Sequence, residues 1–178
     1  MGRMKKRMIA TAMVAIMSIS LVPAAFAADP QEQKLESVIS HSERWVDSNK
    51  KVEITEYDLG DGFTAIETVL DEYNVGLTRN SGTKTQEKTV EIKNGTSVAA
   101  TITVSGTFTY DGKKATVTSY SHSRTVKPGY TETGWGASKG NSGLLNDAYV
   151  SAKLTVKQTS TSKSFSKTAE ITCSKNGD

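Results

Sequence analysis

The chain has 178 residues and a formal net charge of +3, with 36% hydrophobic and 7% aromatic residues. Four positive charges lie in a leader without acidic residues, at Arg3, Lys5, Lys6 and Arg7, so the basicity does not indicate a nucleic-acid partner. After residue 27 the chain holds 18 Lys and Arg against 19 Asp and Glu, and this balance argues against disorder, which accompanies high net charge.

The first 27 residues have the composition of a secretory signal peptide. The basic head is followed by an apolar run over residues 8–22 and by the small-residue exit Ala25-Phe26-Ala27. This run of 15 residues is shorter than the roughly 20 residues that span a bilayer. We therefore expect cleavage before Ala28 and a mature protein that is secreted, extracellular or loosely associated with the cell surface, with no transmembrane segment.

Residues 28–50 are predicted to form one N-terminal amphipathic helix. Asp29 is a suitable N-cap, and Pro30 suits the first helical position. Apolar residues then recur with helical spacing at Leu35, Val38, Ile39, Trp45 and Val46. We expect this helix to cover one face of a sheet, with docking to a partner as the alternative.

A single β domain is expected over residues 51–178. Residues 52–59 and 63–70 flank the turn Gly60-Asp61-Gly62 and favour a hairpin, although the pattern of residues 63–73 also suits a helix. Residues 98–110 alternate between apolar side chains and Ser or Thr, which is typical of a long strand. Two later segments, residues 148–156 and 165–173, alternate in the same way, with one misfit, Lys167. The fold class is therefore mainly β, an antiparallel β-sandwich or open barrel with one N-terminal amphipathic helix.

Two turns set the register of the central strands. Asp111-Gly112 predicts a two-residue hairpin turn. At Asn94-Gly95, a two-residue loop would send Val90 and Ile92 to the face that is rich in Ser and Thr. We therefore predict a three-residue loop over residues 93–95, with its glycine in the left-handed conformation.

Residues 127–147 are interpreted as a long glycine-rich loop, and they are the main candidate for a binding site. Trp135 lies between two glycines, where an exposed ring could stack on a sugar or anchor a partner. The alternative is that Trp135 folds back and closes the end of the core. Tyr130 lies in the same segment, and Tyr120 and Tyr149 are further ligand-contact candidates if they share its face.

Catalytic and zinc motifs fail on their spacing. Residues 136–140 match the G-x-S-x-G elbow of serine hydrolases, but no histidine follows Ser138 to accept its proton. His41 and His122 lack Cys or His neighbours at the spacing of zinc ligands. Cys173 continues an apolar row, which predicts a buried, inert thiol. We expect no catalytic residues, no metal and no cofactor.

Charge is unevenly distributed along the mature chain. Residues 28–82 hold 5 Lys and Arg against 12 Asp and Glu, whereas residues 83–178 hold 13 against 7. The two halves are expected to attract each other within one domain, with two subdomains as the alternative. An acidic turn in the first half is interpreted as solvated, with an irregular calcium site at Glu56, Asp58 and Asp61 as the alternative.

Three short motifs stand out in the second half of the chain. Residues 106–112 read Gly-Thr-Phe-Thr-Tyr-Asp-Gly, residues 134–135 read Gly-Trp, and residues 171–177 read Ile-Thr-Cys-Ser-Lys-Asn-Gly. This set resembles a group of small secreted proteins of Gram-positive bacteria, which pair a Gly-Thr-Phe-Thr-Tyr-x-Gly hairpin with a terminal Thr-Cys-x-x-Asn-Gly. The likeness covers roughly residues 83–178. The resemblance implies export and a β fold, with structural motifs and no mechanism.

The function expected from these observations is a secreted, non-catalytic protein for binding or adhesion at the bacterial surface. Its partner would be a cell-wall glycan or another surface protein. The alternative is a secreted toxin or bacteriocin-like membrane-active protein, because the long alternating strands have one apolar and one polar face. An enzyme that uses Glu53, Glu56 and Glu67 is a third hypothesis, which their spacing does not favour.

Overall fold

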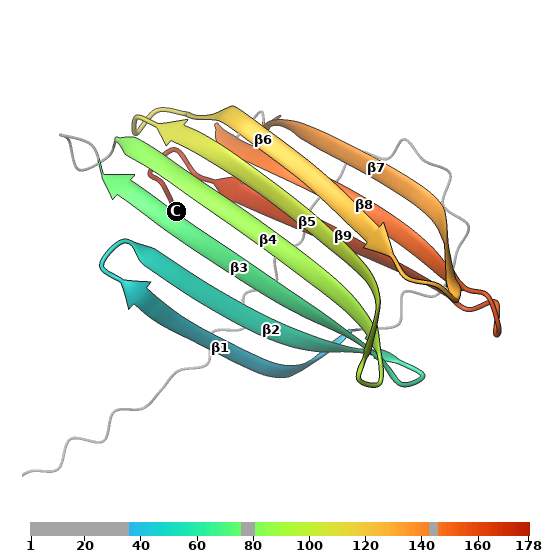
Figure 1. Ribbon diagram of the computed structural model, residues 1–178. Coiled ribbons are helices and arrows are strands. Elements are labelled where there is room, and N and C mark those ends of the chain that lie inside the picture. The colour runs from blue at the N-terminus through green and yellow to red at the C-terminus, as the bar shows by residue number, and fades with distance from the viewer. Residues whose placement is uncertain (1–35, 76–80, 143–145) are drawn as a thin grey trace, which may run out of the picture. The chain divides into compact units, whose positions relative to one another are not determined.

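A computed structural model describes residues 36–75, 81–142 and 146–178, in which nine antiparallel strands lie (Figure 1). The strands belong to one compact unit, residues 34–178. The prediction of a mainly β, antiparallel fold is confirmed. The signal peptide predicted for residues 1–27 lies outside the described residues. The strands are β1 (Ser37–Asp47), β2 (Lys50–Gly60), β3 (Phe63–Val75), β4 (Gly82–Asn94), β5 (Ser97–Tyr110), β6 (Ala115–Val126), β7 (Tyr130–Ser142), β8 (Asp147–Gln158) and β9 (Ser164–Cys173).

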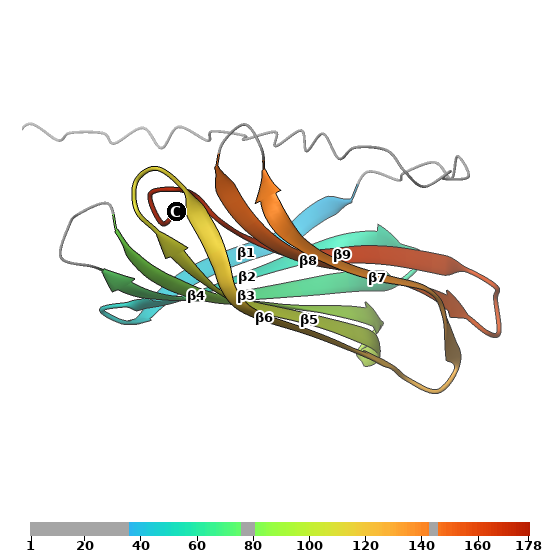
Figure 2. The same cartoon turned by 90° about the horizontal axis from the view of Figure 1, so that it is seen from above.

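The strands form two sheets that face each other (Figure 2). One sheet has six strands in the order β1-β2-β3-β4-β5-β6, and the other has three in the order β7-β8-β9. Each strand therefore pairs with its neighbour along the chain, and the chain changes sheet between β6 and β7. The main contacts between the sheets join β4, β5 and β6 to β7, β8 and β9. The larger sheet thus extends through β1–β3 beyond its main contacts with the smaller one.

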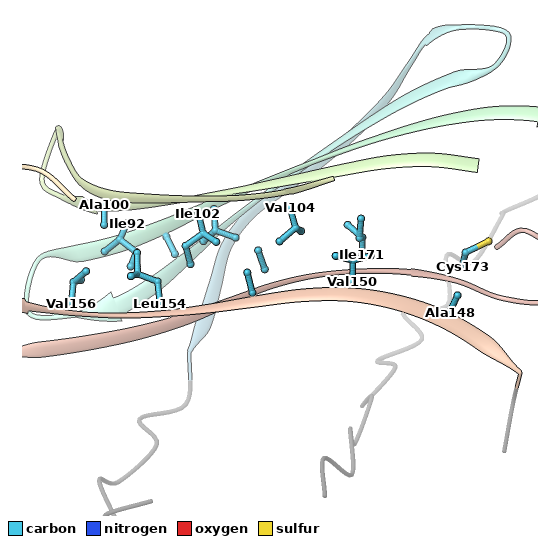
Figure 3. Close-up of a cluster of buried hydrophobic side chains, with 14 of the residues drawn as sticks. Ile92, Ala100, Ile102, Val104, Ala148, Val150, Leu154, Val156, Ile171 and Cys173 are labelled. Carbon is cyan, nitrogen blue, oxygen red and sulfur yellow. The ribbon is translucent and has the colours of Figure 1, made fainter. Parts of the chain in front are cut away.

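The hydrophobic core lies between the two sheets, where side chains from both point toward one another (Figure 3). The alternating row predicted for residues 98–110 forms the inner face of β5, and β8 supplies the facing row. Removing these apolar side chains from water is the main term that stabilises the fold. The largest fully buried side chains are Phe108, Ile92, Ile102, Leu154, Ile171, Val90, Val104, Val150, Val156 and Cys173.

The hairpin motif and the terminal motif singled out in the sequence pack against each other. A Cβ at Gly106 would lie 3.1 Å from Cδ1 of Ile171, so a side chain there would press on the core. Gly177 has a φ of +90°, and a Cβ at this position would lie 2.5 Å from the ring of Tyr110. The ring of Tyr110 therefore lies directly on the backbone of the terminal motif, and the two motifs form one structural unit.

The N-terminal helix predicted for residues 28–50 is wrong where the structure describes this segment. Residues 37–47 form β1, which pairs with β2, while residues before 36 lie outside the described part of the chain. Bulges on β1 fall at Ile39 and Val46. Each bulged residue directly follows another apolar residue, Val38 or Trp45, so two apolar residues stand next to each other at each bulge. These pairs interrupt the period of two and imitate a helical stripe. In contrast, the hairpin predicted around residues 60–62 is confirmed by β2 and β3.

The three-residue loop predicted at residues 93–95 is also wrong. Asn94 pairs with Ser97, so the loop has two residues, Gly95 and Thr96. The inner face stays continuous because β5 has a bulge at Ala99 in the register between Ile92 and Lys93. The positive φ predicted for Gly95 is confirmed at +56°. The apolar pattern required one extra residue between Ile92 and the apolar row of β5. The sequence did not reveal whether this residue lies in the turn or in a bulge of β5.

The two-residue turn predicted at Asp111-Gly112 is a four-residue loop, because Tyr110 pairs with Ala115. The Asp111 carboxylate stabilises this longer loop. Its Oδ1 accepts hydrogen bonds from the backbone N–H groups of Lys113 and Lys114, each at 2.9 Å. These bonds lower the pKa of Asp111, since they favour its charged form. An Asp-Gly pair is therefore compatible with a longer loop when the Asp side chain binds the loop backbone.

Candidate functional site

The segment interpreted as a glycine-rich loop is mostly the strand β7, which corrects that prediction. Glycine has a low strand propensity, and a bulge at Thr133 breaks the alternation of side chains, so the sequence pattern does not resemble a strand. One glycine has a packing role. A Cβ at Gly140 would lie 3.1 Å from the ring of Tyr149, which crosses this part of β7.

The edge strands β6 and β7 of the two sheets contact each other along one side of the molecule (Figures 1 and 2). Their side chains form a row of aromatic and charged groups, which we call the aromatic seam. Cross-strand neighbours of β7 show why these groups share a face: Trp135 pairs with Leu154 and Lys139 with Val150, both core residues of β8. The seam consists of Tyr120, His122 and Arg124 on β6 and of Glu132, Trp135 and Lys139 on β7.

Cations lie over both large rings of the seam. The guanidinium carbon of Arg124 is 4.4 Å from the ring centroid of Trp135, and Nζ of Lys139 is 4.2 Å from that of Tyr120. The ring of His122 lies between the two, 5.8 Å from Trp135 and 6.2 Å from Tyr120. Cation–π contacts of this kind at exposed sites contribute about 0.5–1 kcal/mol. The seam is therefore an ordered row rather than a set of independent surface residues.

One carboxylate partly neutralises the seam. Nε of Arg124 donates a hydrogen bond to Oε2 of Glu132 at 2.6 Å. This bond raises the pKa of Arg124, because it stabilises the guanidinium cation. Lys139 has no such acidic partner among the ion pairs of the described residues. The Lys139 end of the seam is thus the more positive one, and it is the better place for an anionic group.

Trp135 and Tyr120 differ in exposure. Trp135 is half-buried and packs against the core, so it closes the open side between the two sheets. Tyr120 has 45% of its surface exposed, although it lies in the same row. The sequence suggested two roles for Trp135, closure of the core or contact with a ligand. In the structure, Trp135 has the position for the first role, and Tyr120 has the exposure for the second.

The other two predicted ligand-contact residues lie away from the seam. Tyr130 packs edge-on against Phe63 with ring centroids 6.4 Å apart, and its hydroxyl accepts a hydrogen bond from Nδ2 of Asn94 at 3.1 Å. Tyr149 lies beside Gly140, and its neighbours Ala148 and Val150 along β8 point into the core, so it faces away from the core. The structure therefore brings together two of the four candidates.

A charged cluster at the margin of the core was not predicted from the sequence. Nζ of Lys88 lies 2.5 Å from Oε2 of Glu67, and Nζ of Lys167 lies 3.8 Å from Oε1 of Glu67 and 2.5 Å from Oε2 of Glu36. Lys84 forms a further pair with Asp71 at 3.7 Å. These pairs join acidic residues of the first half of the chain to basic residues of the second, as expected from the charge distribution. The one signal in the sequence was Lys167, the misfit in an apolar row.

The acidic turn between β2 and β3 is stabilised by hydrogen bonding of an Asp side chain to the turn's own backbone. Oδ1 of Asp58 accepts a hydrogen bond from the N–H of Gly60 at 2.7 Å, and Asp61 forms an ion pair with Lys163 at 3.0 Å. Among the residues that the structure describes, no three His, Cys, Asp or Glu side chains gather as a group that could hold a metal ion. Within the same ranges, no helix is long and apolar enough to cross a membrane.

Ser138 and Cys173 are the two nucleophiles that the sequence drew attention to. Ser138 lies within β7, so residues 136–140 do not form the strand–turn–helix elbow of a serine hydrolase. Cys173 is buried as predicted, and burial raises the pKa of its thiol to about 11. The thiol is therefore neutral at physiological pH and a poor nucleophile.

Comparison with known proteins adds no functional information. The chain matches no family model, no curated protein and no solved structure at a significant level.

Proposed function

We propose that the protein is a secreted, non-enzymatic β-sandwich that binds an anionic glycan of the bacterial cell wall through the aromatic seam. The observation that carries this proposal is the exposed ring of Tyr120 beneath the ammonium group of Lys139. Aromatic side chains present a flat apolar face with a polar tip, and such a face suits the apolar side of a sugar ring. A cation beside that face suits a phosphate or carboxylate group on the same polymer.

The position of the seam supports this function. It lies along an edge of the two-layer fold, where an extended polymer can follow β6 and β7 without entering a cavity. Within the seam, the contact between Arg124 and Trp135 joins β6 to β7, and Trp135 packs against the core, so the exposed groups are held on an ordered support. A preorganised surface loses less conformational entropy when it binds, which favours affinity.

The membrane-active alternative is less well supported by the geometry. A membrane hairpin would need the apolar row of β5 to be available for lipid. Ile102, Val104 and Phe108 of this row are completely buried against β8 and β9. Exposing this row would therefore require the two sheets to separate, at the cost of the main hydrophobic core.

The test is binding to isolated Gram-positive cell walls, measured by co-sedimentation with the chain from Ala28 onward, which contains all nine strands. We expect binding to native walls and its loss on walls from which the anionic polymer has been stripped. Tyr120→Ala and Lys139→Ala should each weaken binding roughly fivefold to tenfold, since such contacts are worth about 1 kcal/mol.

The matched control is Lys153→Ala. Lys153 is exposed and lies opposite Gly136 in the neighbouring strand, facing away from the core. This variant loses the same charge as Lys139→Ala and should bind like the unmodified protein. Equal binding to stripped and native walls would contradict the proposed ligand. Equal weakening by both Lys variants would mean that binding depends on net charge and not on the seam.

A further inference from the structure

β1 is an edge strand with an unusual number of exposed apolar side chains. It begins the six-stranded sheet, so one side of its backbone has no neighbouring strand in the described fold (Figure 1). All eleven of its residues are exposed. Four of them are large apolar residues with 54–60% of their surface exposed: Val38, Ile39, Trp45 and Val46. An exposed, apolar edge strand is a template for pairing with another strand.

The sequence of β1 is complementary to itself about Ser42. If two copies pair antiparallel with Ser42 opposite Ser42, Val38 lies opposite Trp45, and the bulged residues Ile39 and Val46 lie beside this apolar pair. The same register places His41 opposite Glu43, so a carboxylate meets an imidazole on each side of the axis. A twofold contact requires this kind of self-complementarity, because the same stretch of chain supplies both sides of the interface.

Neighbouring registers lose the match. Centring the pair on His41 places Val38 opposite Glu43 and Ser37 opposite Arg44. Centring it on Glu43 places Trp45 opposite His41 and Asp47 opposite Ser40. Both registers set an apolar side chain against a polar or charged one, which costs free energy when the contact is dehydrated. The apolar residues therefore select a single register.

The opposite edge of the same sheet is different. β6 lies against β7, and its inward-facing groups are engaged in the aromatic seam. The exposed apolar residues are concentrated on β1, since only Ile54 and Tyr120 are exposed large hydrophobic residues elsewhere in the described ranges. We propose that two copies of this chain form a symmetric dimer through antiparallel pairing of β1, which joins their six-stranded sheets into one.

The experiment measures mass in solution and tests the register. Sedimentation velocity on the chain from Ala28 onward should show a species of twice the monomer mass as concentration rises. Val46→Lys places a charge beside Val38 of the second copy and should shift the protein to monomer. The matched control is Ile54→Lys, an exposed apolar residue of β2 that lies one strand in from the edge and pairs with Ser42 of its own copy, which should leave the dimer intact.

A cysteine substitution distinguishes this dimer from any other. Ser42→Cys places two thiols opposite each other at the axis, at a separation close to that of a disulfide. It should form a covalent dimer under mild oxidation, whereas Ser37→Cys, which lies opposite Asp47 in this register, should not. The native Cys173 is buried and does not interfere. A monomer at all concentrations, a dimer unaffected by Val46→Lys, or equal cross-linking of both cysteine variants would overturn the proposal.

Discussion

The two halves of the six-stranded sheet have similar strands and the same antiparallel pairing, but their side chains have different surroundings. The inner faces of β4 and β5 are covered by the smaller sheet and carry the apolar core. The corresponding face of β1–β3 changes from buried Phe63 and Ala65 to charged residues such as Glu67 and Asp71. On β1 every residue is exposed. The same backbone arrangement thus holds the fold together in one half and presents a surface in the other.

This difference shows that strand pairing alone does not indicate where stability lies. A backbone hydrogen bond within the protein replaces one with water, so its net contribution to the free energy of unfolding is only about 1 kcal/mol. Burial of a large apolar side chain contributes about 1.5–3 kcal/mol. We therefore expect the covered half to carry most of the stability, and the uncovered half to tolerate substitution.

The largest contrast should come from removing one apolar side chain in each half. Phe108→Ala empties a completely buried position on β5 and should lower the free energy of unfolding by about 3–5 kcal/mol. Val46→Ala on β1 should change it by less than about 0.5 kcal/mol, because that side chain is 57% exposed. Urea denaturation at low protein concentration measures both values. Comparable losses would mean that β1 contributes to the core after all.

Alkaline pH should weaken the covered half through Cys173. Burial raises the pKa of this thiol from an unfolded value of 9.0 to about 11 in the folded protein. Its contribution is fully present below pH 9 and is lost as pH rises toward 11, which amounts to about 3 kcal/mol. Denaturant titrations from about pH 7 to about pH 11 should show the decline. Cys173→Ala should make the curve flatter, and an unchanged slope would show that other groups cause it.

A smaller contrast is expected between two ion pairs. Lys167 is 6% exposed and pairs with Glu36 and with Glu67, so Lys167→Ala should cost about 1–3 kcal/mol because it leaves Glu67 with Lys88 as its one cationic partner among the ion pairs of the described residues. Lys51 pairs with Glu43 on the exposed hairpin at 2.6 Å, and Lys51→Ala should cost less than about 1 kcal/mol. A double-mutant cycle of Lys167→Ala with Glu67→Gln measures the coupling. No coupling would mean that the cost arises from lost packing of the lysine stem.

The covered half was also the more predictable one from sequence. The alternating rows of β5 and β8 have a period of two because one face is buried, so residues 98–110 and 148–156 were correctly placed. β1 was mistaken for a helix because it buries neither face, and its pattern is therefore not determined by a core. β7 was mistaken for a loop because three glycines and a bulge removed its periodicity.

Of the candidate site, the sequence indicated Trp135 and Tyr120 but not their neighbours. Arg124, His122 and Lys139 lie on two strands from different sheets, and their proximity depends on how the sheets stack. That arrangement is a tertiary property without a local sequence signal. Tyr130 and Tyr149 are aromatic residues of the same type, but their strands direct them elsewhere.

The two proposals place function at opposite edges of the larger sheet. Pairing through β1 would leave the seam on β6 free in each copy. A dimer would therefore present two seams to a polymeric ligand, and two linked contacts bind a polymer more tightly than one contact does. Wall binding and dimer formation remain separable, because Lys139→Ala affects the first and Val46→Lys the second.

The most direct test of the contrast between the two halves is native-state hydrogen exchange at a protein concentration low enough to give the monomer. We expect amides of β5 and β8 to exchange only through global unfolding, and those of β1 to exchange far faster through local opening. Protection of β1 equal to that of β5 at this concentration would contradict the account, because it would place β1 in the same cooperative unit as the core.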